Sequence, residues 1–208
     1  MKKVFFCAAV ALATLNAQAM QITPLGQTIS PSKSSGSLTI TNTSSEKKEY
    51  QFQALKWTLV DGKQVKTSSD DIRFAPSAFY LEPGKSQTVR FINSQKSTDE
   101  LAYRVIATEK NVAKLEKTGV NPIFNMNFPI FWRSSDKALV KAKADGESIV
   151  LRNTSQSTAQ IANLKVGSFE KPGLFGYLLP GEVLTIPSGG ASKITALING
   201  IQTEIAVE

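Results

Sequence analysis

The feature that most constrains the fold is a series of short runs in which apolar and polar residues alternate, each ending at a turn. "SGSLTITNTS" (35–44) alternates up to an Asn-Thr-Ser corner, and "YQFQALKWTLV" (50–60) ends at "DGK" (61–63). Alternation places every second side chain on one face, as in a half-buried β-strand. Because such runs recur along the whole chain, with turn residues about every 8–12 residues, we predict an all-β fold made of sandwiches.

A polar break, "SSDK" (134–137), separates two sets of these runs. "ESIVLRNTS" (147–155) repeats the strand and Asn-Thr-Ser corner of residues 35–44, and a Pro-Gly corner occurs in each half, at 83–84 and 180–181. These similar segments lie about 100 residues apart, which indicates two similar units and not a short-period repeat. We therefore predict two β-sandwiches in tandem, at residues 20–133 and, smaller, at 134–208.

The first residues have the pattern of a secretory signal peptide. Lys2 and Lys3 precede the apolar run "VFFCAAVALATL" (4–15), and "AQA" (17–19) supplies the small residues of a cleavage site. We expect cleavage after Ala19, which removes 19 of the 208 residues and leaves 189. The only cysteine lies in the removed segment, so the exported chain depends on its hydrophobic core without a disulfide.

The composition excludes most catalytic chemistry. The chain has no histidine, and its one cysteine lies in the signal peptide, so imidazole and thiol catalysis and zinc sites built on these ligands are absent. No nucleotide-binding glycine loop occurs. We expect a protein that is not an enzyme and has no cofactor and no metal.

The charge and hydropathy give two further expectations. The formal net charge is +7, of which the signal peptide contributes two, and no helical pattern carries a basic stripe. A diffuse excess of this kind is typical of a solvated surface, so we expect no nucleic-acid binding. No second stretch of about 20 apolar residues occurs, so we expect no membrane insertion.

One stretch, "GVNPIFNMNFPIFWR" (119–133), carries a row of large apolar side chains on one face. The row consists of Val120, Pro122, Phe124, Met126 and Phe128, and asparagines alternate with it. One interpretation is the core-facing side of a half-buried strand. The other is an edge strand, because Pro122 cannot donate a ladder hydrogen bond, and an apolar edge requires a partner to cover it. A partner that lacks a strand could supply that cover by β-augmentation.

Five segments of the chain match a known family in the same order: "SGSLTITNTS", "PSAFYLEPGKSQTVRF" (76–91), "ELAYRV" (100–105), "FPIFWR" (128–133) and "YLLPGE" (177–182). With these segments the sequence resembles the periplasmic pilus chaperones of the PapD-like superfamily. "FPIFWR" is similar to the pattern of the archaic (alternate) branch. The resemblance implies two immunoglobulin-like domains arranged as an L. It also implies a periplasmic chaperone of a chaperone–usher pathway, which stabilises pilus subunits by donor-strand complementation and delivers them to an outer-membrane usher.

The resemblance also assigns roles to individual residues. The apolar row would be the donor strand, and Glu100 and Arg133 match the positions of an internal salt bridge between the domains. A third, acidic member of that network is not evident, and Asn199 lies near its expected position.

The sequence departs from the family at one pair of positions. Better-known members hold the subunit's C-terminal carboxylate with an arginine on the first strand and a lysine on the last. These positions fall near Gly26 or Gln27 and at Pro129, none of which is basic. A carboxylate favours a charged partner. The candidate replacements are Arg90, Arg104 and Lys33.

Two other functional classes fit parts of the sequence. A structural pilus subunit or adhesin would also be exported, although such a chain usually has a single sandwich. A generic binding module of the MSP type resembles residues 76–91 but leaves residues 134–208 unexplained. The sequence leaves open whether the free protein self-associates.

Overall fold

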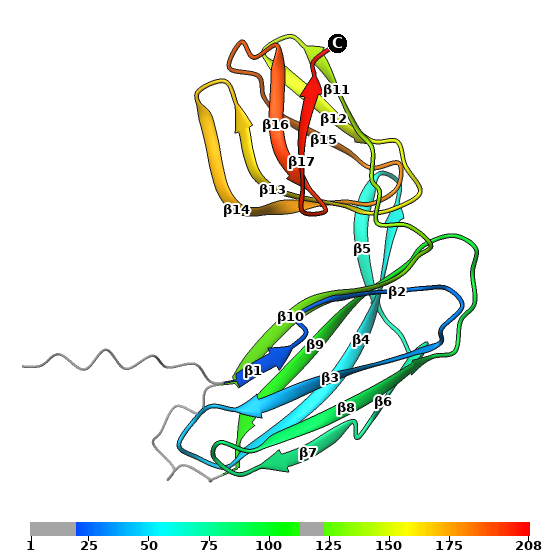
Figure 1. Ribbon diagram of the computed structural model, residues 1–208, viewed down its shortest axis with the longest axis vertical. Helices are drawn as coiled ribbons and strands as arrows, with labels where there is room; N and C mark the ends of the chain where they lie inside the picture. The colour runs from blue at the N-terminus through cyan, green and yellow to red at the C-terminus, as the bar shows by residue number, and fades with distance from the viewer. Residues whose placement is uncertain (1–19, 113–122) are drawn as a thin grey trace, which may run out of the picture.

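The computed structural model of the protein describes residues 20–112 and 123–208, which form two β-sandwiches (Figure 1). All regular elements in these ranges are strands. Among the described residues there is accordingly no helix that is long and apolar enough to cross a membrane. The prediction of an all-β fold is confirmed.

The first sandwich contains a four-stranded and a six-stranded sheet. The four-stranded sheet has the order β1 (Met20–Thr23), β3 (Ser35–Asn42), β8 (Ser86–Asn93), β6 (Ile72–Ala75). The other sheet has the order β2 (Gln27–Ile29), β10 (Ile123–Trp132), β9 (Leu101–Asn111), β4 (Lys48–Val60), β5 (Lys63–Ser68), with β7 (Ala78–Leu81) paired to β4.

The alternation in sequence becomes the core of this sandwich. Every second residue of β3, β8, β9 and β10 points inward, and the buried set includes Leu38, Ile40, Val89, Phe91, Tyr103, Val105, Phe128 and Ile130. Each fully buried aliphatic or phenyl side chain contributes about 1.5–3 kcal/mol by leaving water. The core is therefore large enough to hold the sandwich together without a disulfide.

The second sandwich contains a three-stranded and a four-stranded sheet. The first has the order β11 (Val140–Asp145), β12 (Ser148–Asn153), β15 (Val183–Pro187). The second has the order β14 (Phe169–Leu178), β13 (Ala159–Val166), β16 (Lys193–Ile198), β17 (Ile201–Ala206). Its own core cluster, which includes Ile149, Leu151, Ile161, Leu164 and Ile194, is separate from the first.

The two Pro-Gly corners occupy corresponding places in the two sandwiches. The Gly84 amide donates to the Asn42 carbonyl at 2.9 Å, and the Gly181 amide donates to the Asn153 carbonyl at 3.0 Å. Both glycines have positive φ angles, 69° and 80°, which residues with a β-carbon rarely adopt. The two Pro-Gly sequences therefore form the same turn in both sandwiches.

The N-terminal segment changes sheets after β1. β1 pairs with β3, whereas β2 pairs in parallel with residues 130–132 of β10. Gly26, with φ of 92°, makes the turn between them, and a β-carbon there would lie 3.3 Å from the Pro129 carbonyl oxygen. The switch leaves residues 123–129 of β10 without a strand on the side away from β9, among the residues that the structure describes. We call this stretch the free edge.

The sandwiches meet at one end, with their long axes inclined to one another, and the β4–β5 hairpin reaches the second sandwich (Figure 1). A buried apolar cluster fills the junction, made of Trp57, Ala102, Phe131 and Leu179, with Tyr177 packed against it. On the hairpin, the Gln64 amide donates to the Tyr177 carbonyl at 2.8 Å and to the Glu182 carboxylate at 2.9 Å. Contacts from both sandwiches therefore fix the junction.

Candidate functional site

The free edge is a stretch of the first sandwich that has a neighbouring strand on one side only. β10 pairs with β9 along its whole length, from Ile123 opposite Lys110 to Trp132 opposite Leu101. On the other side, β2 covers only residues 130–132. An open edge presents unpaired N–H and C=O groups and can accept another strand. The free edge is therefore a template for β-augmentation.

The apolar row on β10 passes gradually from the core to solvent. Phe128 is 1% exposed and belongs to the core, Met126 packs half-buried against it, and Phe124 is 47% exposed. Phe128 is thus held by its own sandwich and is not accessible to a partner, because the strand enters the core at this position. Val120 and Pro122, the other predicted members, lie outside the described residues. We call Phe124 and Met126 the exposed row.

On the opposite face of β10, next to the exposed Ile123, two asparagines are tied to β9. The Thr108 hydroxyl donates to Asn125 Oδ1 at 2.7 Å, and Arg104 Nε donates to Asn127 Oδ1 at 2.7 Å. These bonds join neighbouring strands across the sheet surface. They help to hold the exposed row in a defined orientation.

A buried carboxyl group lies beside Phe124 of the exposed row. Glu109 on β9 is the cross-strand partner of Phe124 and is only 1% exposed, and it accepts a hydrogen bond from the Tyr50 hydroxyl at 2.9 Å. Burial raises the pKa of the Glu109 carboxyl above its usual range, and the Tyr50 hydrogen bond and the charge of Lys48 only partly offset this. The sequence did not predict this site, since a glutamate in an alternating strand reads as a surface residue.

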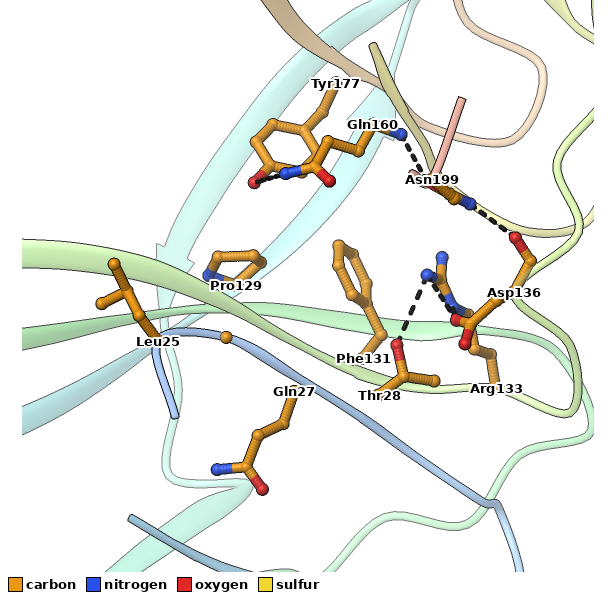
Figure 2. A pocket seen from close by; sticks show the side chains of 11 residues that line it. Leu25, Gln27, Thr28, Pro129, Phe131, Arg133, Asp136, Gln160, Tyr177 and Asn199 are labelled. Atoms are coloured by element: carbon orange, nitrogen blue, oxygen red, sulfur yellow. Dashed lines mark hydrogen bonds and ion pairs between the residues drawn. The ribbon is translucent and has the colours of Figure 1, made fainter. Parts of the chain in front are cut away.

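A cleft of about 280 Å³ lies beside the end of the free edge, between the two sandwiches (Figure 2). Gly26, Gln27 and Pro129 line it, so the predicted positions of the family's basic pair do come together in space. The charged residues of its lining are Arg133 and Asp136, which pair with each other at 2.7 Å. The described lining thus offers no free cation to a carboxylate.

Arg133 is the centre of a buried network between the sandwiches. Its guanidinium contacts Glu100 at 2.9 Å, with both side chains over 90% buried, and donates to the Thr158 carbonyl of the second sandwich at 2.9 Å. Asn199 is joined to the same carbonyl at 3.1 Å. A second carboxylate, that of Asp136 in the connecting segment, lies 2.7 Å from the Arg133 guanidinium, an ion pair that the sequence did not reveal.

The three candidate carboxylate anchors lie in different places. Arg104, on β9, is the cross-strand partner of Pro129 at the end of the free edge. Lys33 is exposed and follows β2, which separates it from the free edge. Arg90 is exposed on β8 in the opposite sheet, so this candidate does not lie beside β10. The reason is topological, because the chain crosses from one sheet to the other between β8 and β9.

Residues 19–137, more than half of the chain, match the family model described as pili and flagellar-assembly chaperone, PapD N-terminal domain. The chain belongs to this family. The resemblance predicted from the sequence is thereby confirmed. No curated protein sequence matches the chain.

Solved chaperone structures share the fold over both sandwiches. A chain of the CsuC–CsuE chaperone–tip adhesion subunit pre-assembly complex, from the archaic chaperone–usher Csu pili of Acinetobacter baumannii, is 19% identical, with a TM-score of 0.70 over 91% of this chain and 98% of that one. The E. coli chaperone DraB is 16% identical, with a TM-score of 0.71 over 91% and 95%. A chain of the Salmonella enterica SafA pilin–SafB chaperone complex is 16% identical, with a TM-score of 0.70 over 89% and 94%. The two-domain arrangement is therefore that of known pilus chaperones.

Proposed function

We propose that this member of the chaperone family binds pilus subunits along the free edge of β10 and delivers them to an outer-membrane usher, in the archaic branch of the chaperone–usher pathway. The observation that carries the proposal is the combination of an unpaired edge at residues 123–129 with an exposed row beside it. The "FPIFWR" ending and the likeness to a structure from the archaic Csu system support the branch.

Two interactions would hold a subunit that lacks one strand. Its backbone would pair with the free edge, and each hydrogen bond would contribute about 0.5–1.5 kcal/mol. Phe124 and Met126 would fill the subunit's open apolar groove, and each side chain buried there would contribute about 1.5–3 kcal/mol. The bound state therefore needs no energy source, and exchange for a strand of another subunit would release the chaperone. In the free protein the same edge is available for self-association.

Arg104 is the anchor that we propose for a carboxylate of the bound strand. It lies at the end of the free edge and already reaches across β10 to Asn127. Strands are about 4.8 Å apart, so the next position along this direction is that of a strand paired on the free edge. Arg90 and Lys33 do not share this placement.

The proposed location is the periplasm, reached by cleavage after Ala19. Met20 starts β1 directly after this point, and its side chain is buried in the first core, which suits a mature N-terminus there. The structure described as the periplasmic chaperone SfaE is among those with the same fold. We place the domain boundary after Arg133, between β10 and β11.

The test is recovery of subunits from the periplasm with a tagged chaperone. Proteins that co-purify with the wild type are identified by mass spectrometry and compared with those held by a Phe124→Asp, Met126→Asp double variant. The matched control is Leu174→Asp, an exposed leucine on β14 that is far from the free edge in sequence and lies in the other sandwich. We expect the double variant alone to lose pilus subunits while remaining folded. Equal recovery with the double variant contradicts the proposal.

A further inference from the structure

Arg104 is a half-buried guanidinium that lacks an acidic partner. Its Nε and Nη2 groups donate to the side chain and the carbonyl of Asn127, at 2.7 and 3.3 Å. No ion pair joins it to a carboxylate among the described residues. Burial lowers the pKa of the Arg104 guanidinium, with Tyr177 acting in the opposite sense. A partly desolvated cation without a carboxylate partner is stabilised further when an anion joins it.

Aromatic rings from both sandwiches hold this guanidinium. It lies 5.1 Å from the centre of the Trp57 ring, in the first sandwich, and 5.5 Å from the Tyr177 ring, in the second. The two rings meet edge to face at 5.3 Å. Rings at these distances attract a cation through their quadrupole. The head of Arg104 is therefore positioned by the junction itself.

The two rings are themselves fixed by polar contacts. Trp57 Nε1 donates to Gln64 Oε1 at 3.2 Å, and Gln160 Nε2 donates to the Tyr177 hydroxyl at 3.1 Å. Glu182 lines the same crevice, but it accepts from Gln64 at 2.9 Å and from the Leu179 amide at 2.7 Å. The nearby carboxylate is thus already engaged, and Arg104 keeps its capacity for an external anion.

We propose that Trp57 and Tyr177 are positioning residues that hold Arg104 ready for a carboxylate at the end of the strand bound on the free edge. This inference rests on the proposed function and adds that recognition of the carboxylate requires the second sandwich. The carboxylate can come from the C-terminus of the bound chain or from an acidic side chain near its end. Removal of the Tyr177 ring frees the guanidinium to move, and a mobile cation binds a carboxylate less well.

The test compares synthetic peptides that differ only in charge at one end. A short peptide of alternating valine and threonine is made with a free C-terminal carboxylate, with a C-terminal amide, and as an amide with a terminal aspartate. Binding is followed by NMR on the amides of residues 123–129 and on the Arg104 Nε–H group. We expect the wild type to bind the carboxylate form about tenfold more tightly than the amide, as a charge-assisted bond predicts. If the aspartate peptide matches the carboxylate form, an acidic side chain is sufficient, and if it matches the amide, the terminus is required.

Three variants separate positioning from folding. Tyr177→Leu should reduce the preference for the carboxylate to about twofold or less and leave affinity for the amide peptide unchanged. Tyr177→Phe, which keeps the ring but loses the contact of the hydroxyl with Gln160, should keep a preference between those of Tyr177→Leu and the wild type. Phe175→Leu is the matched control, because Phe175 lines the same crevice and has no ring contact with Arg104 among the described residues. If Tyr177→Leu prefers the carboxylate peptide over the amide peptide as strongly as the wild type does, the inference is overturned.

Two outcomes bear on the proposed function instead. If Arg104→Gln keeps the wild-type preference for the carboxylate peptide, Arg104 is not the anchor. The positioning role of Trp57 and Tyr177 is then refuted as well. If the wild-type protein shifts none of the amides of residues 123–129 with any peptide, strand binding at the free edge is refuted.

Discussion

Asn42 and Asn153, at the corresponding corners of the two sandwiches, make the same set of side-chain hydrogen bonds. The Asn42 amide donates to the carbonyls of Glu46 and Leu81, at 2.7 and 3.0 Å. The Asn153 amide donates to the carbonyls of Ser157 and Leu178, both at 2.8 Å. Each Oδ1 accepts from the amide and hydroxyl of the serine two residues later, Ser44 or Ser155. The Asn-Thr-Ser sequence therefore has the same structural role in both sandwiches.

These asparagines should be important for the stability of their own sandwich. Both are fully buried, so Asn42→Ala or Asn153→Ala leaves buried carbonyls without donors, at a cost of about 1–3 kcal/mol for each unsatisfied group. Urea unfolding monitored separately for each sandwich by NMR measures the loss. Thr154→Ala, an exposed neighbour, should change stability by less than about 0.5 kcal/mol. Equal effects of the buried and exposed substitutions would disprove the role of the corner.

Gly26 should be required for the switch of the N-terminal segment from one sheet to the other. Gly26→Ala forces a β-carbon to within 3.3 Å of the Pro129 carbonyl oxygen at a φ of 92°. A strained backbone of this kind costs about 1–3 kcal/mol. Faster amide exchange in β2 and a lower midpoint of urea unfolding are the expected results. Gly176→Ala, where a β-carbon meets open space, is the control, and a similar loss in both variants would refute the explanation.

The buried network at the junction should tolerate loss of its exposed acid but not of its arginine. Arg133→Ala leaves the buried Glu100 carboxylate without its cation, which should destabilise the protein by about 3–5 kcal/mol. Asp136→Asn changes an acid whose side chain is 62% exposed, so its cost should stay below about 1 kcal/mol. Thermal unfolding measures both, and a larger effect at Asp136 would show that the network is centred elsewhere.

The raised pKa of Glu109 should make the folded protein less stable as the pH rises. Its pKa is raised in the folded state, so between the ordinary glutamate pKa of about 4.3 and the raised value the unfolded chain binds fewer protons than the folded one. Stability from this group is therefore lost as the pH rises through that window. The stability of Glu109→Gln relative to the wild type should accordingly grow as the pH rises above about 4, as measured by urea midpoints. A constant difference would mean that the carboxyl titrates normally.

The sequence predicted those features that depend on local pattern. Alternation at residues 35–44 and 119–133 predicted strands, which the structure describes at Ser35–Asn42 and Ile123–Trp132, and the two Asn-Thr-Ser corners predicted two similar units. The pairing of β2 was not predictable, because three residues carry too little pattern to select a parallel partner more than 90 residues away. Asp136 was missed for a related reason, since it lies in a polar break that reads as a loop.

The order of the strands and the contacts between the sandwiches could not be predicted from the sequence either. Arg90 and Arg104 both alternate with apolar neighbours, and only the topology places one in the opposite sheet and the other beside β10. The Trp57 and Tyr177 rings around Arg104 come from distant parts of the chain, so no local pattern joins them.

The most direct test of the central claim is amide hydrogen exchange of the chaperone alone and with a subunit recovered from the periplasm. The account predicts that the largest gain in protection falls in residues 123–129, where the edge is unpaired in the free protein, and that β8 in the opposite sheet is unchanged. Unchanged exchange at residues 123–129, with protection gained elsewhere, would contradict it.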